Sequence, residues 1–181
     1  MCSSDLTDGN PIMDLLSEEG MAALARALPV LHQTPADLQA RSVALYGAWL
    51  CGQALANAGM AIHHKLCHTL GGSFNLPHAE THTIVLPHAL AYNQGAAPSA
   101  YARMARALQS DSRGISVAQA VYDLAHRHGV PVALKDLGLT EAQLNQALDI
   151  ALQNQYPNPG PLQREPLREL LYNAWQGVHP A

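Results

Sequence analysis

Apolar residues recur every three or four positions through nearly the whole sequence, which is the spacing of one face of an α-helix. The first helix opens at Asn10-Pro11, where a capping side chain precedes a proline at the first helical position. It is predicted to run to about Leu28 and to end before Pro29. Its apolar face consists of Ile12, Leu15, Leu16, Met21, Leu24 and Leu28.

A second helix is expected from Pro35 to about Gly59, and it is more apolar than a lone surface helix would be. We therefore predict that it runs through the core, with the buried side chains Leu38, Val43, Leu45, Trp49, Leu50 and Leu55.

Shorter helices follow along the rest of the chain, at 60–70, 78–92, 99–108, 116–128, 140–152 and 166–175. The helix at 60–70 should stop at Gly71-Gly72, the helix at 78–92 should bend near Pro87, and Thr140 with Gln143 makes a capping-box pattern. The sequence shows neither a convincing alternating strand nor an internal repeat. It predicts an all-α helical bundle over residues 10–181, preceded by a polar lead-in at 1–9.

The composition limits the classes of function. The 181 residues suit one domain, 48% of them are hydrophobic and only 13% are charged, which predicts a surface partly covered by another domain or subunit. The net charge of −4 without a basic run argues against a nucleic-acid partner. The chain has no apolar run of membrane-spanning length and no secretory signal, and its three cysteines form no close pair. These features favour a cytoplasmic protein with reduced thiols.

The candidate chemistry lies in a block of histidines between positions 63 and 88. His64 and His68 stand four residues apart, and His78 and His82 repeat that spacing, so each pair should share one helix face. A single pair of this kind is more often solvated or hydrogen-bonded in a core than functional. The density of histidines here favours a shared site that holds a metal ion, relays protons or does both.

The same block resembles a known family. The pattern His64-x-x-x-His68-x-Leu-Gly, followed by Pro77-His78 and Leu86-Pro87-His88, is similar to the signature of iron-type (group III) alcohol dehydrogenases. The stretches ALYGAWLCG, HHKLCHTLGG, LPHAETHTIVLPHALAYN and LRELLYNAW resemble the maleylacetate reductase branch. The resemblance implies the helical C-terminal domain of dehydroquinate synthase-like proteins. It also implies that His64 and His78 are metal ligands and that His68 lies beside nicotinamide and substrate.

The sequence departs from that family in two respects. It contains no Gly-rich phosphate loop, so we expect the N-terminal nucleotide-binding domain to be absent and NADH or NADPH to bind mostly outside this chain. It also has no Asp-x-x-x-His pair, which leaves two of four family ligands for Fe²⁺ or Zn²⁺. We expect the isolated chain to be inactive alone, and a homodimer is compatible with the sequence.

The branch implies a reaction and roles for individual residues. Maleylacetate reduction adds a hydride to a carbon–carbon double bond conjugated with a ketone and gives 3-oxoadipate. His68 and His82 are therefore candidate catalytic donors or general acids. The substrate is a small dicarboxylate, for which Lys65 and His88 are candidate binding groups, although Lys65 is equally compatible with a solvated lysine. His63 is expected to pack or hydrogen-bond, and Cys67 is not expected to be a nucleophile.

Three alternatives remain open at this point. The chain could belong to an iron-type alcohol dehydrogenase with another substrate, although Lys65 and Glu80-Thr81-His82 favour the reductase branch. It could be a non-enzymatic helical module that binds a metal or a partner, which would require a complete ligand set within the chain. It could also be an inactive truncated product.

Overall fold

A computed structural model describes residues 10–153 and 156–181; the predicted lead-in at 1–9 lies outside the described residues. The described part of the chain is all-α, as predicted, and contains no β-strand. Short 3-10 helices occupy Gln94–Ala96 (η2), Asp111–Arg113 (η3) and Leu134–Leu137 (η4). The α-helices are α1 (Pro11–Gln33), α2 (Leu38–Ala56), α3 (Ile62–Phe74), α4 (His78–Asn93), α5 (Pro98–Leu108), α6 (Val117–Arg127), α7 (Glu141–Gln153) and α8 (Arg164–Gln176).

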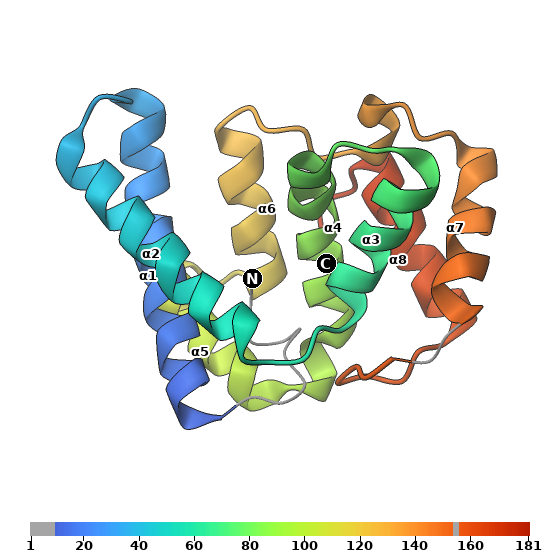
Figure 1. Cartoon of the computed structure of the whole chain (residues 1–181), viewed down its shortest axis with the longest axis horizontal. Helices are drawn as coiled ribbons and strands as arrows, with labels where there is room; N and C mark the ends of the chain where they lie inside the picture. Colours follow the sequence, from blue (N-terminus) through green and yellow to red (C-terminus); the bar gives the residue numbers. More distant parts are fainter. Residues whose placement is uncertain (1–9, 154–155) are drawn as a thin grey trace.

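Helix α4 occupies the middle of the molecule and packs against α3, α6 and α8 (Figure 1). Helices α1 and α2 form a hairpin on one side, while α7 and α8 lie on the other. Helix α5 contacts both α1 and α6 and so links the hairpin to the rest of the bundle. None of the described helices is long and apolar enough to cross a membrane.

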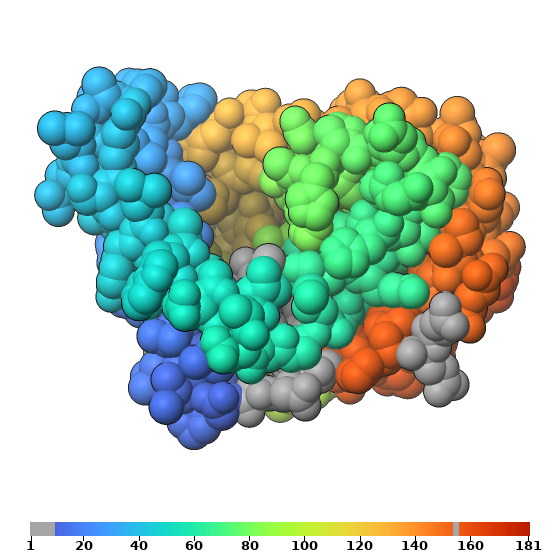
Figure 2. All heavy atoms as spheres, in the orientation of Figure 1, coloured from blue at the N-terminus to red at the C-terminus, as the bar shows by residue number. Residues whose placement is uncertain are grey.

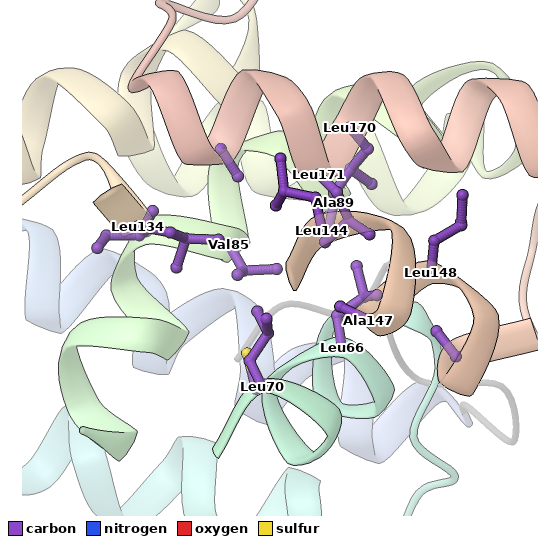
Figure 3. Close-up of a cluster of buried hydrophobic side chains, with 14 of the residues drawn as sticks. Leu66, Leu70, Val85, Ala89, Leu134, Leu144, Ala147, Leu148, Leu170 and Leu171 are labelled. Atoms are coloured by element: carbon purple, nitrogen blue, oxygen red, sulfur yellow. The ribbon is translucent and has the colours of Figure 1, made fainter. Parts of the chain in front are cut away.

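The main hydrophobic core lies between α3, α4, α7 and α8 (Figure 3). Leu66 and Leu70 of α3, Val85 of α4 and Leu148 of α7 are fully or almost fully buried there. Each such side chain contributes about 1.5–3 kcal/mol by leaving water, so this four-helix region is where burial stabilises the fold most. A smaller cluster around Met104 connects α1, α4, α5 and α6.

Helices α1 and α2 pack closely through glycines. A Cβ atom placed on Gly47 would lie 2.9 Å from the carbonyl oxygen of Gly20 and 3.0 Å from the Cβ of Ala23. A Cβ on Gly20 would lie 2.7 Å from the Sγ of Cys51. Only glycine permits this approach of the two backbones, so small residues set the geometry of the hairpin.

The prediction that the second helix runs through the core is wrong. Leu38, Leu45 and Trp49 are 78%, 72% and 60% exposed, because α2 turns its small residues towards α1 and these three side chains outwards. Of the residues predicted to be buried, Leu50 is buried. In Figure 2 the hairpin forms one edge of the molecule, and the surface is hollowed between it and α4, with α6 set back behind. The outward face carries much of the exposed apolar surface, as the predicted covering domain or subunit would require.

Several predicted helix ends are also wrong, and α2 covers Leu38–Ala56 instead of Pro35 to about Gly59. Helix α1 continues through Pro29 to Gln33. A proline removes only one backbone hydrogen-bond donor, and packing against α2 holds the remaining turns of the helix in place. Helix α3 continues through Gly71 and Gly72 to Phe74, and Asn75 adopts the left-handed conformation (φ 54°) that ends it. The loop between α3 and α4 is therefore only Asn75–Pro77.

The capping predictions agree better with the structure. The Asn10 side chain accepts hydrogen bonds from the backbone N–H groups of Ile12 and Met13 at 3.1 Å. The Thr140 backbone N–H donates to the Gln143 side chain at 2.8 Å, which is one half of the predicted capping box. Ser116 and Gln119 form a complete capping box at the start of α6.

Candidate active site

Five histidine rings from α3 and α4 meet around His82. The centroid of the His82 ring lies 4.2 Å from that of His78, 4.8 Å from that of His63 and 5.2 Å from that of His64. His68 extends the cluster, with its ring centroid 6.1 Å from that of His64. The short connection Asn75–Pro77 brings the two helices back against each other, so the structure brings the predicted residues His64, His68, His78 and His82 together.

The cluster changes from buried to exposed across its width. His63 and His64 are buried, His82 is half-buried, and His68 and His78 are exposed on the described surface. A reactant can therefore reach His68 and His78 from outside, while the rings behind them lie in protein. Such an arrangement lets a reactant enter the site from solvent, while the buried side of the site has a low dielectric constant that strengthens hydrogen bonds.

Burial keeps the His63 and His82 imidazoles neutral. It lowers the pKa of His82 to about 3, and the nearby His63, His78, His64 and His68 lower it further, because a second positive charge here would be repelled. Burial likewise lowers the pKa of His63 to about 3, and this effect is partly offset by the hydrogen bond to the His82 carbonyl. At neutral pH both rings can donate through one nitrogen and accept, or bind a metal, through the other.

One hydrogen bond fixes the relation between the two helices at this site. The Nε2 atom of His63 lies 3.0 Å from the backbone carbonyl oxygen of His82. A carbonyl can only accept, so His63 donates from Nε2 and keeps its lone pair on Nδ1. The packing or hydrogen-bonding role predicted for His63 agrees with this contact.

The two predicted substrate-binding residues lie elsewhere. The ammonium group of Lys65 is 5.6 Å from the centroid of the Tyr156 ring, a cation–π contact. His88 is buried and lines a cavity of about 650 Å³ between α4, α8 and the C-terminal residues, together with Tyr92, Gln163, Glu169 and Asn173. Burial lowers the pKa of His88 to about 4, so it is neutral at physiological pH. Binding of substrate by Lys65 and His88 stays a prediction.

The implied metal ligands fit an ion only in part. His64 and His78 both adjoin His82, and imidazole nitrogens suit Zn²⁺ or Fe²⁺. Within residues 10–153 and 156–181, however, the group of three side chains whose ligand atoms are close enough for an ion is His63, Cys67 and His82. An ion at His64 and His78 would need further ligands from outside this region.

The sequence interpretation overlooked that second group of ligands. His63 and Cys67 have the same four-residue spacing as His64 and His68, so the signal was present in the sequence. What the spacing could not show is that α4 places His82 against His63 and Cys67.

Comparison with protein families now identifies the class of this chain. Residues 6–175 match the model of the C-terminal part of the Fe-containing alcohol dehydrogenase family, and the chain belongs to that family. The resemblance inferred from the histidine motifs and the predicted fold class are both confirmed.

Individual relatives are more specific. The chain is 54% identical over 175 residues to the maleylacetate reductase of Burkholderia cepacia, covering 96% of this chain and 48% of the relative. The crystal structure of a maleylacetate reductase from Agrobacterium tumefaciens matches with a TM-score of 0.91 and 44% identity, covering 97% of this chain and 49% of that one. An iron-containing alcohol dehydrogenase from Corynebacterium glutamicum matches with a TM-score of 0.90 and 40% identity, covering 99% and 49%. The chain thus spans about half the length of the relatives it matches.

Proposed function

We propose that this chain is the helical, substrate-side half of an NAD(P)H-dependent maleylacetate reductase. The observation that carries the proposal is the 54% identity over 96% of the chain to such an enzyme, with the histidine cluster formed on α3 and α4. Because the chain spans about half of that relative, we assign nucleotide binding to the other half of the intact enzyme. Hydride transfer therefore needs both halves.

The proposed reaction needs two kinds of group from this chain. Addition of a hydride to the carbon–carbon double bond moves negative charge onto the conjugated ketone oxygen, which a hydrogen-bond donor stabilises as an enolate. A proton must then reach the neighbouring carbon. An ion held by His64 and His78 would polarise the same ketone oxygen when bound.

The pKa of His82 indicates how the two tasks are divided. Its imidazolium form is scarce at neutral pH, because its pKa is about 3, so we assign it the role of a neutral N–H donor to the enolate oxygen. His68 lies at the exposed rim, where a proton lost to the product can be replaced from water. We therefore assign proton delivery to His68.

The position of Lys65 affects how the dicarboxylate would bind. A role in holding a substrate carboxylate requires its ammonium group to leave the Tyr156 ring and turn towards the cluster. Surface cation–π contacts stabilise by about 0.5–1 kcal/mol, which an ion pair with a carboxylate can replace. Lys65 is thus a binding group that would move on substrate entry.

The proposal is tested with a chimaera in which this chain replaces the matching C-terminal half of the Burkholderia cepacia relative. We expect it to oxidise NADH or NADPH in the presence of maleylacetate, and the intact relative is the positive control. The His68→Ala chimaera separates turnover at this site from background oxidation. A folded chimaera that binds nucleotide but leaves maleylacetate unreduced would contradict the proposal.

A second candidate function is oxidation or reduction of a simple alcohol or aldehyde. The observation in its favour is the close match to the iron-containing alcohol dehydrogenase of Corynebacterium glutamicum. The same chimaera assayed with simple alcohols and NAD⁺ distinguishes the two candidates.

A further inference from the structure

A second ligand cluster lies behind the proposed catalytic rings, on the buried side of α3. His63 and Cys67 stand one helical turn apart, and His82 approaches them from α4. One ligand atom from each residue lies within 4.8 Å of those of the other two. His63 is 3% exposed and Cys67 1% exposed, so two of the three ligands lie inside the protein, and the third, His82, is half-buried.

The hydrogen bond of His63 prepares this residue as a ligand. Its Nε2–H donates to the His82 carbonyl at 3.0 Å, which leaves the Nδ1 lone pair as its metal-binding atom. Metal-bound histidines in proteins almost always donate their other ring nitrogen to a carbonyl or carboxylate in this way, because the bond fixes ring orientation and tautomer. Here the partner carbonyl belongs to another residue of the cluster, so one contact positions both helices.

His82 supplies the second imidazole. Its Nε2 atom is buried and has no hydrogen-bond partner among the described residues. A buried polar atom in this state costs free energy, typically about 1–3 kcal/mol, unless something binds it. An ion in the space between His63, Cys67 and His82 would satisfy this atom.

We propose that His63, Cys67 and His82 form a binding site for a thiophilic divalent transition metal such as Zn²⁺, separate from the His64–His78 pair. Zinc binds imidazole nitrogen at about 2.0–2.1 Å and thiolate sulfur at about 2.3 Å, so the ligand atoms must close in by roughly an ångström, which side-chain rotation provides. The Cys67 thiol releases its proton to solvent as the metal–sulfur bond forms. Three protein ligands leave a fourth position for water.

This site has a consequence that depends on the proposed function. His82 belongs to both groups, so an ion bound between His63, Cys67 and His82 turns the His82 ring and displaces the N–H donor assigned to the enolate oxygen. Thiophilic metals should therefore inhibit the reductase without competing with substrate for His68. The metal-binding proposal itself does not depend on catalysis and is tested without it.

The test is a titration of the 181-residue chain with Co²⁺, followed by absorption spectroscopy. Co²⁺ replaces Zn²⁺ in such sites and gives a thiolate-to-metal charge-transfer band in the near ultraviolet when cysteine is a ligand. We expect this band to saturate at one equivalent and to disappear in Cys67→Ser. It should persist in the control variant in which Cys2 and Cys51 are both serine, and in the double variant His64→Ala/His78→Ala.

Absence of the band in the unsubstituted chain, its survival in Cys67→Ser, or its loss in His64→Ala/His78→Ala would each overturn the proposal. Should Cys67→Ser fail to fold, alkylation of the unsubstituted chain replaces it. Zn²⁺ should then slow the modification of Cys67, measured by mass spectrometry, at least tenfold relative to Cys51. Equal protection of both cysteines, or of neither, would overturn the proposal as well.

Discussion

The α3–α4 pair and the α1–α2 hairpin are both helix pairs built from apolar sequence, yet they are used in opposite ways. In the first pair, leucines enter a four-helix core, and histidines gather beside it in a cluster that extends from buried to exposed positions. In the second pair, glycines form the contact and large apolar side chains face outwards. A high density of apolar residues thus indicates that a helix has an apolar face to be covered, and the surface that covers it need not belong to the same domain.

The two helix pairs also differ in how firmly buried side chains hold them in place. The histidines stand on helices that bury Leu66, Leu70, Ile84 and Val85 directly beneath them, which holds the rings in place. A site built on such helices keeps its geometry better than one on loops. The hairpin has no comparable core. It is held together by the contact between α1 and α2 and is attached to the rest of the molecule mainly through α5.

The largest expected effect concerns His68 in the reductase chimaera. Replacing it with Ala removes the group assigned to proton delivery, which is typically worth about 10² to 10⁴ in rate. We expect kcat to fall by that factor while the melting temperature and nucleotide affinity stay nearly unchanged, since His68 is exposed. A clear loss of melting temperature with modest loss of kcat would instead make His68 a structural residue.

The two regions should differ sharply in their response to the same truncation. Leu70→Ala in α3 empties a fully buried position and should destabilise the chain by about 2–5 kcal/mol. Leu45→Ala in α2 removes a side chain that is 72% exposed and should change stability by less than about 0.5 kcal/mol. Urea unfolding of both variants measures the difference. Similar losses would show that the outer face of α2 is covered in solution.

Glycine substitutions test the contact inside the hairpin. In Gly47→Ala the new methyl group would lie 2.9 Å from the Gly20 carbonyl oxygen of α1, and overpacking of this kind costs about 1–3 kcal/mol. Gly52→Ala on the same helix meets nothing within 4 Å and should stabilise by about 0.5–1 kcal/mol through its better helix propensity. Thermal unfolding decides, and a neutral Gly47→Ala would mean that the hairpin adapts freely.

The buried histidines should make stability depend on acidity. Folding lowers the pKa of His63 and His82 to about 3 and that of His88 to about 4, so below pH 6.5 the unfolded chain binds more protons than the folded one. Stability should therefore fall as the pH drops from about 6.5 towards 4. His88→Gln should make this decline shallower, whereas His126→Gln, at an exposed position, should leave it unchanged. Identical pH profiles for the unsubstituted chain and His88→Gln would contradict the assignment.

Local patterns in the sequence predicted much of this structure. Caps and apolar spacing located every α-helix within the described residues, and the two four-residue histidine spacings anticipated that α3 and α4 would bring their rings together. The errors at Pro29 and at Gly71-Gly72 arose where packing outweighed the helix-breaking tendency of proline and glycine. A helix held by its neighbours tolerates a missing hydrogen-bond donor or a flexible residue.

Other features depend on contacts between helices and could not be predicted. The spacing of Leu38, Leu45 and Trp49 predicts a covered face but does not identify what covers it. His63 and Cys67 become a candidate ligand set only because His82 reaches them from α4. The separation of Lys65 and His88 from the cluster likewise follows from the orientation of their side chains in the folded chain.

The measurement that tests the central proposal most directly is the ratio of kcat/KM for maleylacetate to that for a simple aldehyde, both assayed with NADH in the chimaera. A reductase of the proposed kind should prefer maleylacetate by at least about a hundredfold, since a site that pairs with two carboxylates leaves its polar groups unpaired when the substrate lacks them. A chimaera that turns over the aldehyde equally well or better would contradict the proposed function.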